Sequence, residues 1–151
     1  MTAFVIRAAE PGDATALGAV FRRSSLSNAG DRANLLAHPE VLEFSDLAVL
    51  EGRTRVAVAD GRVIGFATWL SAPDALDIED LFVDPDWTGG GAGRALVLDL
   101  IKIARGRGLR RLEVTANQHA VAFYEKVGFV ARHQVETSFG PAPRMYLEVP
   151  P

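Results

Sequence analysis

Residues 81–96 read Leu81-Phe82-Val83-Asp84-Pro85-Asp86-Trp87-Thr88-Gly89-Gly90-Gly91-Ala92-Gly93-Arg94-Ala95-Leu96. A β-rich run ends at Val83, four glycines follow within five positions, and a helical pattern opens near Ala92. Free amides at the start of a helix, together with the helix dipole, favour an anion, and glycines let a ligand approach the backbone. The stretch therefore predicts a phosphate-binding turn between a strand and a helix, the alternative being a loop that is merely flexible.

Two common nucleotide-binding fingerprints are missing from this stretch. The dinucleotide spacing G-x-G-x-x-G fails because Gly93 is followed by Arg94-Ala95-Leu96, and no Gly-Lys-Ser/Thr ending is present. Both absences argue against a Rossmann protein or a P-loop ATPase. A different mixed α/β protein that holds ATP or a sugar nucleotide on the glycine loop stays open as an alternative.

Strands and helices alternate on both sides of the glycine loop. Asp60-Gly61 predicts a β-hairpin, because both positions of its turn need residues that tolerate positive φ. The expected strands are 4–8, 54–59, 63–70, 75–83, 109–115, 129–135 and 144–149. The expected helices are 14–21, 92–105 and 118–126, with a broken helical region over 22–50 and a turn over 71–74.

The resulting order is β-α-α-β-β-β-α-β-α-β-β over residues 1–151, without an internal repeat or a long linker. Strands 54–59, 63–70 and 75–83 follow one another directly and predict an antiparallel meander. Helices separate strands only in the second half of the chain, which favours a mixed sheet over a fully parallel one. We expect one α/β domain with a mostly antiparallel central sheet flanked by helices.

Composition excludes several classes of function. Sixteen Lys and Arg against nineteen Asp and Glu give a net charge of −3 and no basic field for a nucleic acid. The sequence has no cysteine, so it carries no disulfide, cysteine-type metal site or thiol nucleophile. The three histidines, His38, His119 and His133, lack the spacing of a metal site, and we expect no metal.

Hydropathy predicts neither a leader nor a membrane span. No basic leader precedes a long apolar stretch, and the longest apolar-rich run, 63–70, is far shorter than the roughly 18 residues that a span requires. We expect a soluble, cytoplasmic protein with no membrane and no nucleic-acid partner.

A second segment reads Asn117-Gln118-His119-Ala120-Val121-Ala122-Phe123-Tyr124-Glu125-Lys126-Val127-Gly128-Phe129. It is similar to the signature Asn-x-x-Ala-x-x-Phe-Tyr followed by Gly-Phe in the GNAT superfamily of N-acetyltransferases. Residues 88–93 resemble the acyl-CoA signature of that superfamily, Gln/Arg-x-x-Gly-x-Gly/Ala, with Thr88 in place of Gln or Arg. Two such segments in the family's order are more specific than either alone, and the element order extends the resemblance over almost the whole chain.

The resemblance implies an enzyme that transfers an acetyl group from acetyl-CoA to a primary amine. The implied mechanism is direct attack of the amine on the thioester in a ternary complex, which agrees with the absence of a cysteine that could form an acyl-enzyme. The acceptor is a small-molecule amine or an amine of a protein. The alternative is a non-catalytic acyl-CoA-binding module of the same fold, which the Thr88 departure and the undefined base keep open.

Several residues receive roles by resemblance. Tyr124 would protonate the CoA sulfur, Asn117 would bind near the pantetheine, and the backbone amide of Leu81 would polarise the thioester carbonyl. The alternative for Tyr124 is simple packing beside Phe123. Cofactor contacts are expected from Leu81, Phe82, Val83, Thr88, Gly89, Gly90, Gly91, Ala92, Gly93, Arg94, Asn117, Ala120, Phe123 and Tyr124.

The general base is less well defined. Period-two alternation places Asp77, Glu79 and Leu81 on one face of a strand and makes both carboxylates eligible. Glu79 is the first candidate, Asp77 the second, and Glu113 on the neighbouring strand the third. A chain of waters is an alternative to any single base. The non-catalytic alternative for each of the three residues is an exposed carboxylate on the sheet.

The acceptor side is expected in 22–46 and in the loop 138–144, again by resemblance. The loop contains Phe139-Gly140-Pro141-Ala142-Pro143, a stiff apolar run that suits an acceptor contact and a homodimer contact equally. A basic cluster at a helix end suits either a solvated terminus or the CoA phosphates: Lys102, Arg105, Arg107, Arg110 and Arg111.

Overall fold

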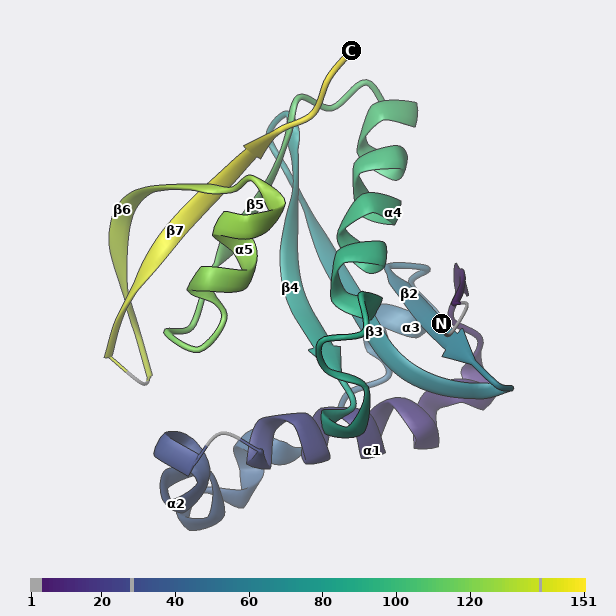
Figure 1. The fold of residues 1–151 in the computed structure, drawn as a ribbon, viewed down its shortest axis with the longest axis vertical. Helices are drawn as coiled ribbons and strands as arrows, with labels where there is room; N and C mark the ends of the chain where they lie inside the picture. The colour runs from purple at the N-terminus through teal and green to yellow at the C-terminus, as the bar shows by residue number, and fades with distance from the viewer. Residues whose placement is uncertain (1–3, 28, 139) are drawn as a thin grey trace. The chain divides into compact units, whose positions relative to one another are not determined.

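The computed structural model describes residues 4–27, 29–138 and 140–151. Within these ranges one mixed sheet has the strand order β1-β2-β3-β4-β5-β7-β6 (Figure 1). Its strands are β1 Val5–Ala8, β2 Thr54–Ala59, β3 Arg62–Ala72, β4 Ala75–Val83, β5 Arg111–Thr115, β6 Val130–Thr137 and β7 Gly140–Glu148. The pairs β1–β2, β2–β3, β5–β7 and β6–β7 are antiparallel and β4–β5 is parallel, which confirms the expected mixed, mostly antiparallel sheet.

The helices are α1 Ala14–Leu26, α2 Ala29–Ala37, α3 Leu47–Leu50, α4 Ala92–Gly106 and α5 Val121–Val127. Helix α1 extends beyond the expected end at 21, and α3 is an additional short helix. Helix α2 ends just before His38-Pro39, because a residue that precedes proline disfavours the helical conformation. No helix of the described ranges is long and apolar enough to cross a membrane.

The chain divides into two compact units, and each is described by itself. Unit 1 is Met1–Thr68 with Asp80–Leu96, and unit 2 is Trp69–Glu79 with Val97–Pro151. Unit 1 holds β1, β2, most of β3, the end of β4 and α1–α3. Unit 2 holds the start of β4, most of α4, then β5, α5, β6 and β7.

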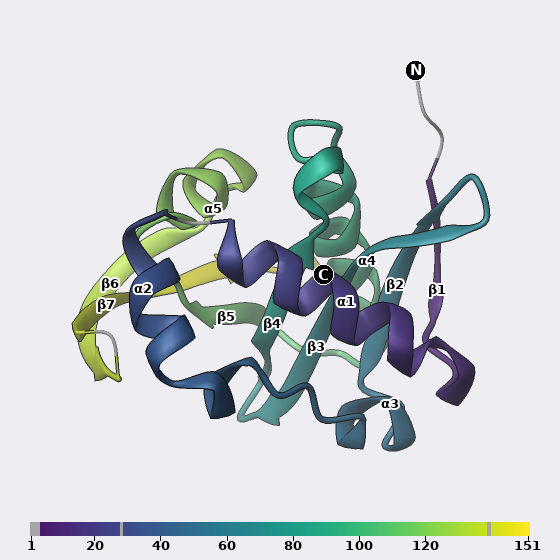
Figure 2. The same cartoon turned by 90° about the horizontal axis from the view of Figure 1, so that it is seen from below.

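In unit 1, helix α1 covers one face of strands β2 and β3 (Figure 2). Leu17 and Val20 of α1 pack against Val49, Val56 and Phe66 in a buried cluster. Fully burying one such side chain contributes about 1.5–3 kcal/mol. Aromatic rings extend the cluster, in the pairs Phe21–Phe82, Phe44–Phe66 and Phe66–Phe82.

The chain enters α1 through a tight polar turn. Asp13 accepts a bond from the Glu10 amide at 2.8 Å and is ion-paired with Arg7 of β1 at 2.8 Å. The Arg7 bond is the main reason that the pKa of Asp13 is lowered, against the opposing effect of burial. This contact fixes the reversal between β1 and the helix.

The β2–β3 hairpin forms as predicted. Asp60 and Gly61 have φ of 52° and 74°, the left-handed conformation that the two central positions of a type I′ turn require. Strand β3 continues to Ala72, so the turn expected over 71–74 shrinks to Pro73-Asp74. Two sequential strands joined by two residues are antiparallel, as the meander requires.

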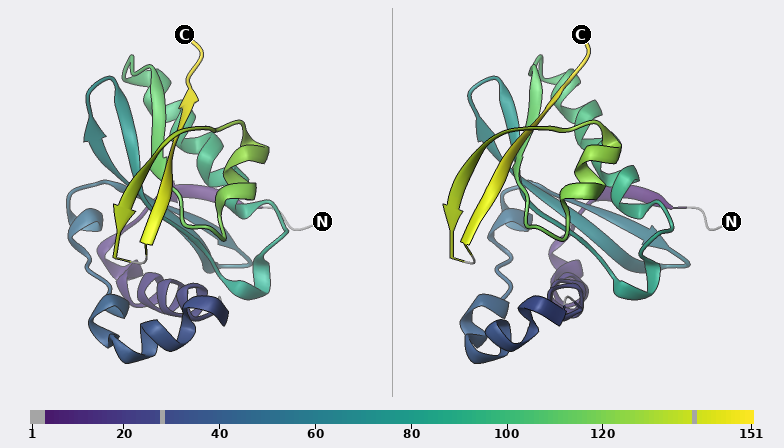
Figure 3. Two further views of the ribbon diagram at one scale, coloured as in Figure 1. Left: turned by 90° about the vertical axis from the view of Figure 1, so that its left-hand side faces the viewer. Right: turned by 60° about the vertical axis from the view of Figure 1, so that its left-hand side comes forward.

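In unit 2, β7 pairs with both β5 and β6, and α5 lies beside this part of the sheet (Figure 3). Gly128, with φ of 120°, ends α5, and a Cβ built there would meet the Leu147 side chain of β7 at 3.2 Å. The aromatic residues Tyr124 and Phe129 are buried in this unit.

The loop expected over 138–144 is largely strand, because β7 begins at Gly140. Pro143 lies beyond the end of the β5–β7 ladder, and its carbonyl accepts the Ala116 amide at 3.0 Å. The N and O of one strand residue point the same way, so the missing N–H of Pro143 also points away from β6, and the β6–β7 ladder loses no bond there. Phe139 lies outside the described residues.

Candidate active site

In unit 1, hydrogen bonds from β3 and from α1 hold the residues that lead into the glycine loop. The Asp84 amide donates to Ile64 O of β3 at 2.7 Å, and Asp84 Oδ1 accepts the Asp86 amide at 3.0 Å. Arg23 of α1 donates to Asp84 Oδ2 at 2.9 Å and to Asp86 Oδ2 at 3.0 Å. Asp84 is buried. The loop therefore starts from a fixed point on the core.

The glycine loop itself presents backbone to solvent. Gly89 and Gly91 have φ of 80° and 93°, a conformation that other residues rarely adopt. The Ala95 amide donates to Gly91 O at 2.9 Å and makes the first bond of helix α4. Amides 91–94 precede that bond and have no acceptor within the helix, so they are available to an anion.

The two polar side chains near the loop, Thr88 and Arg94, differ in their contacts. The Thr88 hydroxyl donates to Pro85 O at 3.1 Å and closes the preceding turn. Arg94, in the first turn of α4, is exposed and has no ion-pair partner among the described residues. The Phe4 ring lies beneath the loop, 3.8 Å from a Cβ built at Gly90. Ahead of the loop, Leu81, Phe82 and Val83 are half-buried on β4.

The second signature begins α5 in unit 2. Asn117 accepts the Ala120 amide at 3.0 Å through both its side-chain and its backbone oxygen, so part of its side chain's capacity is used in the turn. Because of this turn, α5 begins at Val121 and not at 118. Tyr124 is 4% exposed, and its ring contacts those of Phe123 and Phe129 at centroid distances of 5.2 and 5.1 Å.

Two of the three predicted bases lie together in unit 2, bound to one arginine. Arg144 of β7 donates to Asp77 Oδ1 at 3.0 Å and to Glu113 Oε1 at 3.1 Å, and also to the Thr115 hydroxyl. Arg111 donates to Glu113 Oε2 at 2.9 Å. Burial lowers the pKa of Arg144, but its bonds to the two carboxylates raise it above its ordinary value overall.

This Arg144 cluster was not predicted as a unit. Arg144 is 67 residues from Asp77 and 31 from Glu113 in sequence, and the three meet through the β4–β5–β7 register. Both oxygens of Glu113 already accept arginine N–H groups. Glu79, the first candidate, is exposed on β4.

Asp80 is a carboxylate that was not among the predicted bases. Its Oδ2 accepts a bond from Thr68 at 2.7 Å in unit 1. Burial raises its pKa, and the Thr68 bond and the charge of Arg53 oppose that rise less strongly. A signal was available, because Asp80 alternates with Ile78 and Phe82 on the face that the same periodicity assigns to the core.

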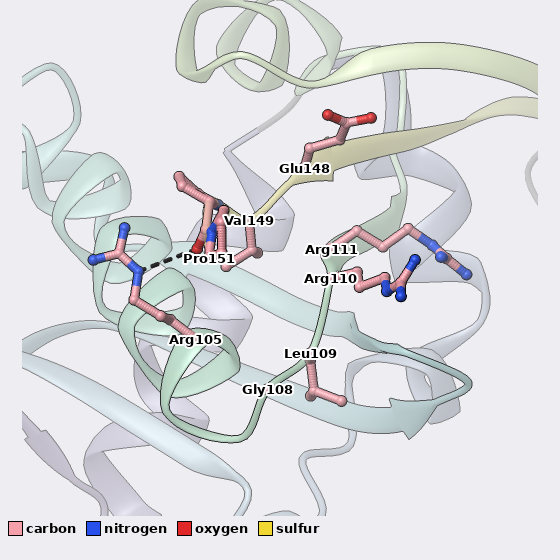
Figure 4. Close-up of a pocket in the computed structure, with 9 residues that line it drawn as sticks. Arg105, Gly108, Leu109, Arg110, Arg111, Glu148, Val149 and Pro151 are labelled. Atoms are coloured by element: carbon pink, nitrogen blue, oxygen red, sulfur yellow. Dashed lines mark hydrogen bonds between the residues drawn. The ribbon is translucent and has the colours of Figure 1, made fainter.

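The basic cluster does not converge on one point. Arg105 donates to Pro150 O at 3.3 Å, Arg107 lies over the Trp69 ring at 5.6 Å, and Arg111 is bound to Glu113 and to Pro73 O. A hollow of about 680 Å³ lies here, lined by Arg105, residues 108–111 and residues 148–151. Figure 4 shows the bond from Arg105 Nε to Pro150 O, with the guanidinium groups of Arg110 and Arg111 turned away from it.

No group of three or more His, Asp or Glu that could hold a metal is found in the part of the chain that the structure describes.

Comparison with known proteins places the chain in a family. The model of the acetyltransferase (GNAT) family matches residues 25–129, which is more than half of the chain, and the protein belongs to this family. The chain is similar to glucosamine 6-phosphate N-acetyltransferase of Trypanosoma brucei brucei, with 35% identity over 49% of this chain and 55% of that protein. It is also similar to serotonin N-acetyltransferase 2, chloroplastic, of Oryza sativa subsp. japonica, with 30% identity over 83% of this chain and 61% of that protein.

Solved structures show the same fold over nearly the full length. PaiA N-acetyltransferase from Thermoplasma acidophilum, solved in complex with coenzyme A, has a TM-score of 0.78 at 19% identity and covers 97% of this chain and 99% of that chain. The ribosomal-protein-S18-alanine N-acetyltransferase from Escherichia coli has a TM-score of 0.72 at 23% identity, covering 97% of this chain and 94% of that chain. At these identities the likeness shows the fold alone.

Proposed function

We propose that the protein is an acetyl-CoA-dependent N-acetyltransferase that acts on a primary amine. The observation that carries this proposal is the glycine loop, whose amides 91–94 precede the first hydrogen bond of α4 and follow a turn held by Asp84 and Arg23. Such an arrangement binds the pyrophosphate of a CoA thioester. The exposed Arg94 adds a cation beside these amides. Membership of the acetyltransferase family supports the same activity.

The proposal assigns the chemistry to direct attack of a neutral amine on the thioester. The Leu81 amide polarises the carbonyl, and Tyr124 gives its phenolic proton to the CoA sulfur as it leaves. Asp77 and Glu113 are already bonded to Arg144, so a proton would have to displace an arginine N–H from either of them. Glu79, which is exposed on β4, stays the first candidate for the base in this proposal.

Calorimetric titration with acetyl-CoA, beside CoA, ATP and NAD, tests the cofactor without knowledge of the acceptor. We expect tight binding of the two CoA species alone. In Gly91→Ala binding should weaken, because alanine disfavours a φ of 93° and the loop would shift. Gly106→Ala is the matched control, since Gly106 has ordinary φ and an added Cβ meets nothing within 4 Å. Selective binding of ATP or NAD would overturn the proposal.

Three amines taken from the names of related proteins make a first acceptor screen: glucosamine 6-phosphate, serotonin and a peptide that begins with alanine. Sequential initial-velocity patterns are expected, and ping-pong kinetics with an acetylated enzyme would contradict direct attack. Acetyl-CoA binding without acetyl transfer to these amines or to a wider set of primary amines would favour the non-catalytic acyl-CoA-binding module.

Tyr124→Phe separates protonation of the sulfur from packing. Phenylalanine keeps the ring contacts with Phe123 and Phe129, so stability and acetyl-CoA affinity should change little while kcat falls by about 10²-fold. Tyr146→Phe is the matched control, because Tyr146 lies on β7 and its ring contacts His133. Unchanged kcat in Tyr124→Phe would leave Tyr124 a packing residue only.

A further inference from the structure

Strand β6 forms an open edge of the sheet in unit 2 (Figure 3). Within the described ranges it pairs with β7 on one side only, and seven of its eight residues are exposed. The strand at the other end of the sheet order, β1, has four residues. A long edge strand leaves a row of backbone N–H and C=O groups without partners and is a template for pairing with another chain. The outer side of β6 is therefore a surface for strand pairing.

The prolines of β7 determine which backbone groups of β6 point outward. Pro143 O accepts the Ala116 amide, so the backbone groups of Pro143 point away from β6. Its register partner Gln134 is then in a non-hydrogen-bonded pair, and its own N–H and C=O point away from β7. The same holds for Glu136, which is the register partner of Pro141. The open edge of β6 thus presents hydrogen-bonding groups at Gln134 and Glu136.

A second copy of this chain is the partner that these groups fit. Two identical strands related by a two-fold axis pair antiparallel, and the residue on the axis defines their register. An axis at Gln134 joins the two outward-facing Gln134 residues by a pair of ladder bonds and overlaps residues 131–137 of both copies. It also sets Arg132 of one copy opposite Glu136 of the other, and symmetry forms this pair twice.

The charges on β6 distinguish this register from its neighbours. Arg132 and Glu136 are exposed, and neither has an ion pair among the described residues. An axis at Arg132 or at Glu136 would set like charges opposite each other, which is destabilising. An axis at His133 or at Val135 would set both charges opposite neutral residues. Charges on an edge strand normally discourage pairing, but these two lie symmetrically about Gln134 and favour one register.

Arg132 lies at an irregularity of β6, where the register with β7 shifts between Ala131 and His133. A bulge bends the strand that carries it, so the regular ladder bonds are expected at the axis, two residues away. The long side chain of Arg132 reaches a carboxylate on the neighbouring strand across the bend. One ladder over 131–137 is small beside the roughly 1,200–2,000 Å² that stable interfaces bury, so the association should be weak.

We propose that the protein forms a two-fold dimer in which β6 pairs antiparallel with β6 of a second copy. Gln134 lies on the axis, and two ion pairs between Arg132 and Glu136 cross it. The contact therefore lies on β6, and Pro141 and Pro143 contribute by leaving its outward groups unpaired within the chain. The dimer is independent of the proposed acetyl transfer, and its test needs neither acetyl-CoA nor an amine.

Sedimentation equilibrium of the whole chain measures the association. We expect a monomer–dimer equilibrium that weakens as salt is raised, because exposed charges are screened. Glu136→Arg replaces both ion pairs by contacts between arginines, and Arg132→Glu replaces them by contacts between glutamates. Each should raise the dimer Kd by at least about tenfold. Arg62→Glu, at the exposed start of β3 in unit 1, is the matched control and should keep the wild-type Kd.

A mixture of the two edge variants is the decisive experiment. In a mixed dimer both arginines of Glu136→Arg face glutamates of Arg132→Glu, so both ion pairs return. We expect the mixture to form a heterodimer although each variant alone stays monomeric. The double variant Arg132→Glu/Glu136→Arg should likewise regain the wild-type Kd. A mixture that stays monomeric would overturn the register.

Gln134→Pro tests the ladder separately from the charges. Because the Gln134 N–H points away from β7, proline removes no ladder bond within the chain, and the circular dichroism spectrum should be unchanged. The ladder bonds at the axis are lost, so the dimer should disappear. A wild type that stays monomeric up to about 1 mM would leave the edge to a different partner and overturn the proposal. A dimer that either Glu136→Arg or Gln134→Pro leaves intact would overturn it too.

Discussion

Asp80 is a carboxyl group whose burial opposes its own ionisation. Its pKa in the folded protein is raised, so between the ordinary value near 3.8 and the raised value the folded state holds a proton that the unfolded state has lost. Stability therefore falls as pH rises through that window, and the cost persists above it. Thr68 and Arg53 offset part of this cost.

The first prediction at this scale is that Asp80→Asn raises stability at neutral pH. The amide has no charge to desolvate, so the variant should unfold at a higher denaturant concentration than the wild type at pH 7. The difference should shrink to nothing as the pH falls below about 4, where the wild-type carboxyl is protonated in both states. Urea unfolding over this pH range measures it, and a variant less stable at pH 7 would show that the charge stabilises the fold.

The stability and the activity of Asp80→Asn together tell whether this carboxylate is kept for structure or for chemistry. Residues kept for structure lose stability when they are changed, whereas residues kept for chemistry commonly gain it. Stability and kcat/KM measured on the same preparation therefore separate the two roles.

At the scale of elements, strands β3 and β4 approach each other closely beside the site. A Cβ built on Gly65 would lie 3.0 Å from Phe82 O and 3.4 Å from a Val83 methyl group. A carbonyl oxygen cannot move without shifting strand β4. The absence of a side chain at Gly65 thus sets the position of the strand that carries Asp80 and Leu81.

Gly65→Ala should therefore destabilise the protein by about 1–3 kcal/mol, the usual cost of overpacking. Thermal unfolding followed by circular dichroism measures the effect, and Gly106→Ala provides a change of the same kind at an open position. If Gly65→Ala left the midpoint of thermal unfolding unchanged, the close approach of β3 to β4 would not contribute to stability.

The prolines of β7 show how an element can contradict its local sequence. The resemblance predicted a loop over 138–144, yet Pro141 and Pro143 both lie in a strand, paired with Glu136 and Gln134 of β6. The carbonyl of Pro143 points away from β6, toward Ala116, and the missing N–H groups of both prolines point to the same side, so the β6–β7 ladder loses no bond. Such a placement depends on which side the paired strand occupies, which the local residues do not encode.

At the scale of the whole molecule, cofactor binding should stabilise the folded chain by mass action. A ligand that binds only the folded state adds about 2.7 kcal/mol at a concentration one hundred times its Kd. We expect acetyl-CoA and CoA to raise the melting temperature in a concentration-dependent way, and NAD to leave it unchanged. Gly91→Ala should reduce the rise without abolishing the unligated fold. Equal shifts with NAD would argue against a CoA site.

Local features of the site followed from neighbouring residues. The glycine loop, the Asp60-Gly61 hairpin and the signature around Tyr124 are each contained in a short stretch, because a turn or a helix start depends on the conformational preferences of a few adjacent residues. The mixed, mostly antiparallel sheet followed from the order of these elements. The acetyltransferase family was recognisable for the same reason.

The side-chain clusters, by contrast, depend on strand register. Thr68 meets Asp80 across 12 residues, and Arg144 meets Asp77 across 67. A shift of one residue in either pairing would turn these side chains to opposite faces. Residue order alone therefore determined which chemical groups the protein has and the elements that carry them. Tertiary structure decided which carboxylates are bonded to arginine and which one is partly buried against a threonine hydroxyl, because burial and charge pairing are properties of assembled strands.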